Sequence, residues 1–309
     1  MPQFRISRST LIDAQPQAVF DTVADFHTWQ SWSPWLRIDP EAKVTVSQPS
    51  GDVDATYDWD GEVVGAGGMR HRVVDRPSHL SDDLHFIRPF KSQSGVTFDF
   101  EPQNGQTKVT WTMAGKLPFF LFFMKKSMES FISMDYDRGL AMLKERIETG
   151  AVASRVEDIG VVDVDGVCMA GVSGEGKLGS VSEAMTPCIQ QATEAFESQS
   201  VSHCDSFMSV YHPSDIANGQ VRFTTGWSIT AGCSVGKPLE KVTLPAGKAL
   251  RLRHIGRYEN LGNAWSGAYQ FARYHKLKVA KSPGWEIYVN DPDDTATEEL
   301  ITDVYVPLR

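Results

Sequence analysis

One acidic residue in the last quarter of the chain has the type and spacing that chemistry requires. Glu286 lies in the segment GWEIYVNDP, which alternates like a β-strand and then enters a turn. Because strand side chains alternate between faces, Glu286 and Tyr288 share one face, and Trp285 points the other way, under a helix. A carboxylate among aromatic rings loses hydration, so its pKa is expected to rise. A cation between the acid and the rings would remove this cost and add about 0.5–2 kcal/mol of cation–π energy per ring.

Glu286 also has two other interpretations. As an edge-strand residue it would face water and pair with a Lys or Arg, without any ligand. As a general acid or base with a pKa raised toward neutrality, it would hydrolyse an electrophile that a tyrosine hydroxyl polarises. The residues alone leave all three interpretations open.

An internal repeat in the second half of the chain provides the elements that would position Glu286. Residues 166–179 and 247–262 each read as a strand followed by a loop that ends in Leu-Gly before a helix. Two further strands follow in each copy, so we expect two β-α-β-β units offset by roughly 80 residues. Such a duplication predicts a pseudo-twofold domain with a cleft on its axis. The alignment of the two copies places Ser209 and Tyr211 beside Glu286.

Three segments of the second half resemble the GyrI-like family, an effector-binding domain also found in Rob- and BmrR-type multidrug-sensing regulators: PAGKALRLRHIGRYENLGNAW, GWEIYVNDP and TEELITDVYVPL. The resemblance covers residues 158–309. It implies two repeats around a central cleft for lipophilic, often cationic, small molecules, with the key acid at Glu286. It also implies hydrolysis of electrophilic toxins as an activity of some stand-alone members. The aromatic walls implied by the resemblance are Tyr211, Tyr258, Trp265 and Tyr288.

The first half has a different order of elements. A helical pattern that ends at Ser33-Pro34 is followed by short alternating runs, and the Asn-Gly of PQNGQ (102–106) predicts a hairpin turn between two of them. Residues 125–148 predict a long helix with Tyr136 and Leu140 on one face. One long helix over a curved antiparallel sheet is an α+β arrangement.

Segments of the first half resemble the polyketide-cyclase/START-like group with its helix-grip fold: VADFHTWQSWSPWLRIDP, ATYDWDGEVVGAGGM and MDYDRGLAMLKERIE. The resemblance covers residues 1–148 and fixes no chemistry. It implies a deep apolar cavity between the sheet and the long helix. Equally, Trp29, Trp32 and Trp35 are candidates for simple core packing. The candidate residues for lining the cavity are Trp35, Tyr57, Trp59, His71 and Trp111.

Composition excludes several classes of function. The net charge is −9 with no large basic cluster, which argues against direct nucleic-acid binding. The four cysteines form no C-x-x-C pair and are expected to be reduced thiols of a cytoplasmic protein. The N-terminus lacks the apolar region of a signal peptide, and the longest apolar run, 118–124, is too short to span a bilayer.

Several motifs are weak. GEGKLG (174–179) matches a dinucleotide-binding pattern, but a repeated strand-to-helix turn explains it equally well. The acidic run 291–299 lacks the ligand spacing of a calcium loop, and the histidines lack the spacing of a zinc site. We therefore expect no metal and no cofactor.

The sequence as a whole predicts an α+β protein of two domains. A START-like domain at residues 1–148 and a linker at 149–157 precede a duplicated GyrI-like domain at 158–309. We expect binding of lipophilic small molecules, with cationic ones among the candidates, and hydrolysis of an electrophile as the alternative function. A non-catalytic interaction protein with both cavities collapsed remains a third hypothesis. The ligand and the oligomeric state cannot be read from the residues.

Overall fold

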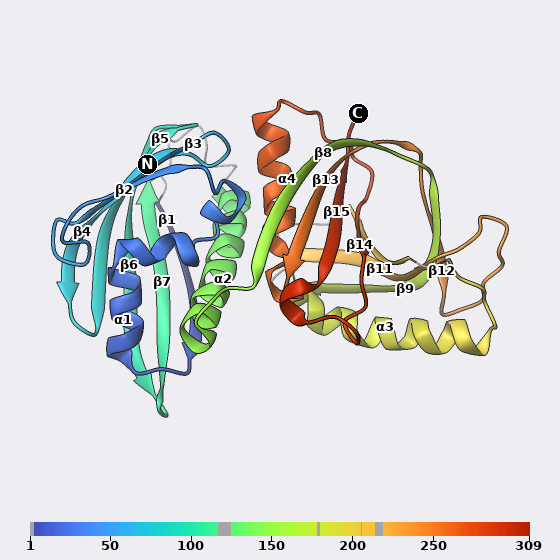
Figure 1. Cartoon of the computed structure of the whole chain (residues 1–309), viewed down its shortest axis with the longest axis horizontal. Helices are drawn as coiled ribbons and strands as arrows, with labels where there is room; N and C mark the ends of the chain where they lie inside the picture. The colour runs from blue at the N-terminus through green and yellow to red at the C-terminus, as the bar shows by residue number, and fades with distance from the viewer. Residues whose placement is uncertain (1–2, 117–124, 178–179, 205, 214–218) are drawn as a thin grey trace. The chain divides into compact units, whose positions relative to one another are not determined.

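The computed structural model describes residues 3–116, 125–177, 180–204, 206–213 and 219–309 (Figure 1). The chain divides into two compact units, Met1–Val152 and Ala153–Arg309. Each unit has its own antiparallel sheet with helices packed on it, so the predicted α+β class is confirmed. The apolar run 118–124 lies outside the described residues. In the described parts of the chain, no helix combines the length and apolar character needed to cross a membrane.

In its described residues, the first unit contains one sheet and two α-helices. Its strands are β1 (Gln3–Ile12), β2 (Lys43–Val46), β3 (Thr56–Gly61), β4 (Gly65–Asp75), β5 (His79–Arg88), β6 (Ser92–Gln103) and β7 (Gln106–Lys116). Its helices are α1 (Pro16–Ala24), the 3₁₀ helices η1 (Phe26–Ser31) and η2 (Leu36–Ile38), and α2 (Lys125–Thr149). The strand order is β1-β7-β6-β5-β4-β3-β2, so chain neighbours pair along most of the sheet.

The turn between β6 and β7 confirms the Asn-Gly prediction. Gln103 pairs with Gln106 across a two-residue loop. Asn104 and Gly105 have φ angles of 51° and 83°, the left-handed region that a tight hairpin of this kind needs. The first helix, in contrast, ends before the predicted position. It stops at Ala24, because the Asp25 side chain accepts a hydrogen bond from the His27 backbone and starts η1 instead.

Helix α2 covers the first sheet with the face that the sequence predicted. Tyr136, Leu140 and Leu143 are buried in the same core as the sheet residues. Gly139 lies on this face and allows a close approach, because a Cβ atom there would lie 2.8 Å from Cζ3 of Trp111.

We expect Gly139→Ala to lower the free energy of unfolding by about 1 kcal/mol. Overpacking of a dense core costs about 1–3 kcal/mol, and this exceeds the gain of about 1 kcal/mol in helix propensity. Urea denaturation measures the change, and Lys126→Ala on the exposed side of α2 is the control, with a change within about 0.5 kcal/mol. A more stable Gly139→Ala variant would show that the contact with Trp111 does not limit packing.

The part of the second unit that the structure describes is a larger antiparallel sheet with two α-helices (Figure 1). Its strands are β8 (Ser154–Val164), β9 (Val167–Lys177), β10 (Phe207–His212), β11 (Gln220–Ser228), β12 (Glu240–Leu244), β13 (Gly247–Gly256), β14 (Gly284–Tyr288) and β15 (Ile301–Pro307). Helix α3 (Val181–Ser198) packs on β9 and β11, and α4 (Gly262–Tyr274) packs on β13, β15 and β8. The strand order is β12-β9-β11-β10-β14-β15-β13-β8.

Part of the predicted linker is a strand. Residues 154–157 begin β8, which pairs with β13 at the edge of the sheet. An edge strand exposes much of its surface and tolerates polar side chains, which is why this stretch was mistaken for an unstructured connection.

The second sheet buries apolar residues on both faces. Trp285 lies in a cluster whose buried members all come from strands, so the prediction that it lies under the repeat's helix is wrong. The helices cover the other face, where Trp265 of α4 and Met185 of α3 contact residues of β10 and β14. Glu286 and Tyr288 therefore point toward the helices. The buried members of the strand cluster are Met169, Met208, Val210, Leu244, Ala249 and Trp285.

Candidate functional site

Glu286 lies at the centre of the second sheet. Strand β14 is flanked by β10 and β15, and Glu286 is in register with Ser209 on one side and Val304 on the other. Its exposed fraction is 0%. The interpretation of Glu286 as a solvent-facing edge residue is therefore wrong, and its carboxyl group must be stabilised inside the protein.

Three neutral donors hold the Glu286 carboxyl group. The hydroxyl groups of Tyr211 and Tyr288 donate to Oε1 at 2.6 and 2.7 Å. The indole Nε1 of Trp265 donates to Oε2 at 2.9 Å. Among the described residues, Glu286 makes no ion pair with a Lys, Arg or His side chain. Within the described residues, neutral dipoles alone therefore hold the carboxyl group.

Burial dominates the electrostatics of this site. It raises the pKa of Glu286 above its usual value of 4.5, and the three donated hydrogen bonds oppose the rise. Burial, followed by the charge of Glu286, also raises the pKa of Tyr211 and Tyr288 well above 10. Both tyrosines thus remain protonated at neutral pH and act as hydrogen-bond donors to the acid.

Neighbouring residues explain how the Trp265 side chain reaches the strand. A Cβ atom at Gly284 would lie 2.9 Å from Cη2 of Trp265, so the glycine leaves the space that the indole ring fills. Tyr211 packs edge-on against this ring with centroids 5.0 Å apart. The absence of a side chain at position 284 is therefore what lets α4 deliver a donor to Glu286.

The predicted aromatic residues gather around the acid. Tyr211, Trp265 and Tyr288 contact Glu286 directly, while Tyr258 packs edge-on against Tyr288 with centroids 5.4 Å apart. All four aromatic side chains are partly exposed, whereas Glu286 is fully buried. The acid therefore lies beneath a partly accessible aromatic surface.

The sequence analysis did not identify two residues near Glu286, Thr225 and Met185. Thr225 accepts a hydrogen bond from Ser209 at 2.9 Å. The sulfur of Met185 lies 3.6 Å from Oγ of Ser209 and 3.8 Å from the Tyr288 hydroxyl group. No motif marks Met185. Its position on the inward face of the amphipathic helix α3 was the one available signal.

The candidates in the first unit lie in or against its core. Tyr57, His71 and Trp111 are buried, and Trp35 and Trp59 are half-buried. Trp111 stacks on Tyr136 with centroids 3.9 Å apart, and Trp35 packs edge-on against it. Trp29 and Trp32 belong to the same aromatic core.

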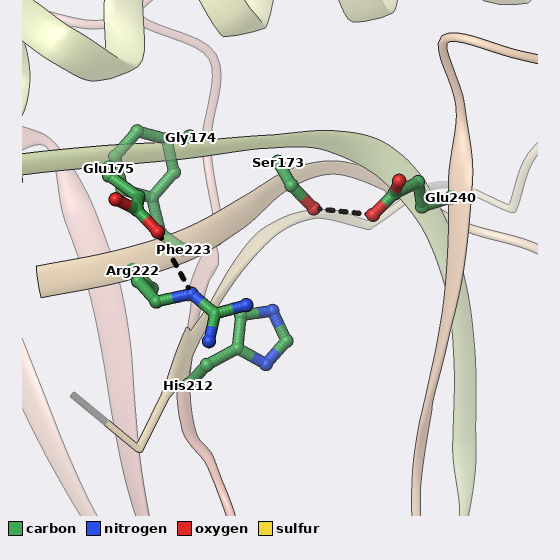
Figure 2. Close-up of a pocket in the computed structure, with 7 residues that line it drawn as sticks. All are labelled: Ser173, Gly174, Glu175, His212, Arg222, Phe223 and Glu240. Atoms are coloured by element: carbon green, nitrogen blue, oxygen red, sulfur yellow. Dashed lines mark hydrogen bonds and ion pairs between the residues drawn. The ribbon is translucent and has the colours of Figure 1, made fainter.

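The second unit also has a small polar pocket of about 190 Å³ (Figure 2). Its charges are compensated locally, because Arg222 pairs with Glu175 at 3.2 Å and Ser173 donates to Glu240 at 3.0 Å. The volume is below the range of about 300–1,000 Å³ that is usual for ligand sites. The residues lining it are Ser173, Gly174, Glu175, His212, Arg222, Phe223 and Glu240.

The glycine motif GEGKLG does not form a phosphate-binding loop in its described part. Gly174 and Gly176 belong to β9, and their register partners lie on β11. Backbone groups committed to a sheet cannot cradle a phosphate. Among the described residues, no cluster of three or more His, Cys, Asp or Glu side chains is arranged to hold a metal ion.

Small-molecule sites are commonly lined by aromatic side chains with a few polar groups, and the surroundings of Glu286 have this composition. Comparison with known families agrees with this class of site. Residues 158–309 match the family described as GyrI-like small molecule binding domain. Residues 3–148 match the family described as polyketide cyclase/dehydrase and lipid transport. The predicted resemblance of each half of the chain to its family is thus confirmed.

No curated protein sequence matches the chain. Similar solved structures include the Aha1 dimer from Colwellia psychrerythraea, with 16% identity and a TM-score of 0.37, covering 48% of this chain and 98% of that one. TTHA0849 from Thermus thermophilus has 16% identity and a TM-score of 0.38, covering 48% and 99%. MLL2253 from Mesorhizobium loti has 16% identity and a TM-score of 0.38, covering 47% and 97%. Scores this low support no inference about function.

Proposed function

We propose that the second unit binds a lipophilic organic cation and that Glu286 supplies the counter-charge. The observation that carries this proposal is a fully buried carboxyl group held by three neutral donors and, among the described residues, by no basic side chain. A buried carboxylate without a counter-charge is costly even when it is hydrogen-bonded. A bound cation would offset that cost and would favour the ionised form of the acid.

The surrounding rings favour the same class of ligand. Tyr211, Tyr258, Trp265 and Tyr288 are partly exposed, so part of this aromatic surface can be reached from solvent. Aromatic faces attract cations through the ring quadrupole and also accommodate the apolar part of an organic cation. A lipophilic cation uses both properties, whereas a hydrated metal ion uses neither.

The strand order supports a duplicated domain with its ligand site on the axis. From one edge, the order is β12 and then β9, β11 and β10, which are the first, third and second strands of one β-α-β-β copy. From the other edge, the order is β8 and then β13, β15 and β14, which hold the same positions in the second copy. The two copies meet at β10 and β14, which carry Ser209 and Glu286 as a register pair. We propose that the ligand cleft lies along this junction, between α3 and α4.

For the first unit, we propose an apolar cavity associated with the candidate side chains of its core, within a START-like domain of residues 1–148. The whole chain would act as a cytoplasmic binder or sensor of small lipophilic molecules, without direct contact to nucleic acid. The aromatic lining proposed for this cavity is Trp35, Tyr57, Trp59, His71 and Trp111.

The test compares the affinity of aromatic quaternary ammonium compounds for the wild-type protein and for Glu286→Gln. Gln can keep all three hydrogen bonds, because its oxygen can face Trp265 and its amide group can donate to the tyrosine hydroxyls. We expect a loss of about 2–5 kcal/mol of binding energy, roughly 30-fold or more in Kd. Neutral molecules of the same shape should lose little. Equal cation affinity in both proteins would remove the proposed role of Glu286.

A hydrolase is the second candidate function, because two tyrosine hydroxyl groups converge on the same oxygen of an acid whose pKa burial raises. In this case the Glu286 carboxylate takes a proton from water while the water oxygen attacks a strained electrophile. A tyrosine hydroxyl then protonates the leaving atom, and the proton on Glu286 restores the tyrosine. Turnover of a strained electrophile that Glu286→Gln abolishes would favour this function, and saturable binding without turnover would contradict it.

A further inference from the structure

The face of the second sheet that points away from its helices has a row of stacked side chains. Strands β14, β15, β13 and β8 lie side by side in this order (Figure 1). Trp285 of β14, Tyr305 of β15 and Arg251 of β13 are register partners, so their side chains share one face. The rings of Trp285 and Tyr305 have centroids 5.0 Å apart and planes at 4° to each other. Cζ of Arg251 lies 5.6 Å from the centroid of the Tyr305 ring, so the row ends in a guanidinium group.

A second arginine joins this row through a shared acid. Asp303 of β15 is the register partner of Arg253 on β13. Nε and Nη2 of Arg253 donate to the two Asp303 oxygens at 2.8 and 3.0 Å, and Nη2 of Arg251 donates to the same carboxylate. The side chain of Asp303 is 4% exposed, whereas those of Arg251 and Arg253 are 26% and 27% exposed. The two guanidinium groups therefore cover the acid and remain accessible to solvent themselves.

The charges around this row leave an excess of positive charge. Arg251 and Arg253 share the single carboxylate of Asp303. On the edge strand β8, Glu157 is the register partner of Arg253 and pairs with Arg155 at 3.0 Å. These five residues together carry one more positive than negative charge. Nη1 of Arg251 and Nη1 of Arg253 make no hydrogen bond within the described residues, so both can donate to a further acceptor.

The row is open beyond Arg251. The register partner of Arg251 on β8 is Gly160, which has no side chain that could cover the guanidinium group. A Cβ atom at Gly160 would meet no atom of the described chain within 4 Å, its chain neighbours aside. A planar group can therefore stack on the outer face of the Arg251 guanidinium group, opposite to Tyr305.

The free donors and the open stacking position define a class of ligand. A guanidinium group binds a carboxylate through its planar array of N–H donors, and it also stacks on aromatic rings. The excess positive charge favours an anion and repels a cation, in contrast to the surroundings of Glu286 on the opposite face. A flat ring with an attached carboxylate uses both the stacking position and the donors.

We propose that Arg251 and Arg253 form a binding site for an aromatic carboxylate on the face of the second sheet opposite to Glu286. The ring stacks on Arg251, and the carboxylate accepts hydrogen bonds from the Nη1 groups of both arginines. This site does not depend on the cation site proposed above. With both sites, the second unit would bind organic anions and organic cations on opposite faces of one sheet.

The test compares 2-naphthoate with the neutral 2-naphthamide, each titrated into the full chain and measured by calorimetry. The two probes share a ring system, but only the first carries a charge. We expect 2-naphthoate to bind at least about tenfold more tightly than the amide, and Arg251→Gln to weaken its binding at least about tenfold. Arg251→Gln is expected to fold, because Asp303 keeps both hydrogen bonds from Arg253.

Arg251→Lys separates recognition by the guanidinium group from simple charge attraction. Lysine keeps the positive charge but lacks the planar donors and the flat surface for stacking. We therefore expect this variant to bind 2-naphthoate at least about fivefold more weakly than the wild-type protein does. Wild-type affinity in Arg251→Lys would show that only the charge matters and would contradict the proposed stacking.

Two further variants locate the bound anion. Arg222→Gln removes the same charge from β11, which three strands separate from β13, and should change the affinity for 2-naphthoate by less than about twofold. Equal affinities of the two probes, or a 2-naphthoate affinity that survives in Arg251→Gln, would overturn the inference. Binding that strengthens in Glu286→Gln and ignores Arg251→Gln would place the anion beside Glu286 and would overturn it too. The cation titrations stand or fall separately, since they use the other face.

Discussion

The affinity for a permanently charged aromatic cation should increase by about tenfold per pH unit as the pH approaches the raised pKa of Glu286 from below, and should level off above it. The bound cation pairs with the carboxylate, so binding at low pH must displace one proton from Glu286. Burial raises the pKa of this group from its usual 4.5, so the affinity should level off only at a pH above 4.5. Titration calorimetry in buffers of different ionisation enthalpy measures both the affinity and the released proton.

The control for this prediction is Glu286→Gln, whose cation affinity should not change with pH over the same range. A quaternary ammonium probe is required, because its own charge does not titrate. Stability provides an independent check on the sign. The folded state holds a proton on Glu286 more tightly than the unfolded chain does, so this group lowers the free energy of unfolding as the pH rises from about 4.5 through the raised pKa. A flat affinity profile in the wild-type protein would contradict the role of the carboxylate.

Replacement of His71 alone should have the largest effect on stability. In His71→Leu, Asp82 stays buried and loses the one side chain that hydrogen-bonds to it among the described residues, and we expect a loss of about 3–5 kcal/mol in the free energy of unfolding. Urea denaturation measures the loss and the coupling energy. It compares the wild-type protein with His71→Leu, Asp82→Leu and the double variant His71→Leu/Asp82→Leu.

The double variant should recover most of the stability lost in His71→Leu, because it no longer buries an unpaired acid. If His71→Leu and the double variant are equally unstable, then the loss of stability comes from packing around the imidazole ring and not from the charge pair. The branched Leu side chain cannot reproduce the planar stacking of the His71 ring on Phe26, so a small residual loss is expected even in the double variant.

The sequence predicted those parts of the fold that depend on residues close together in the chain. The Asn-Gly turn before β7 and the apolar face of α2 are properties of neighbouring residues. The wrong predictions concern features that depend on contacts between distant parts of the chain. The polar start of β8 resembles a linker because an edge strand tolerates exposure, and Trp285 was assigned to the wrong core because this sheet buries apolar residues on both faces.

Two of the buried acids, Glu286 and Asp82, show why one site was predicted and another was missed. Glu286 stands alone in an apolar strand, so its position is conspicuous in the sequence. Asp82 lies in the polar run SDDLH, next to the exposed Asp83, and resembles a surface residue. Its burial follows from the register of β5 against β4, which pairs it with His71. The spacing of residues within one segment does not determine the register between strands, so the pairing of His71 with Asp82 could not be predicted from the sequence.

The hydrogen-bond pattern around Glu286 makes its two oxygens chemically inequivalent. An indole nitrogen can only donate, so Oε2 must stay an acceptor toward Trp265 whether the acid is ionised or neutral. Oε1 faces two hydroxyl groups that can rotate and exchange their roles. A proton bound to the acid is therefore better placed on Oε1, where a tyrosine hydroxyl group can accept a hydrogen bond from it, while Oε2 keeps its bond from Trp265.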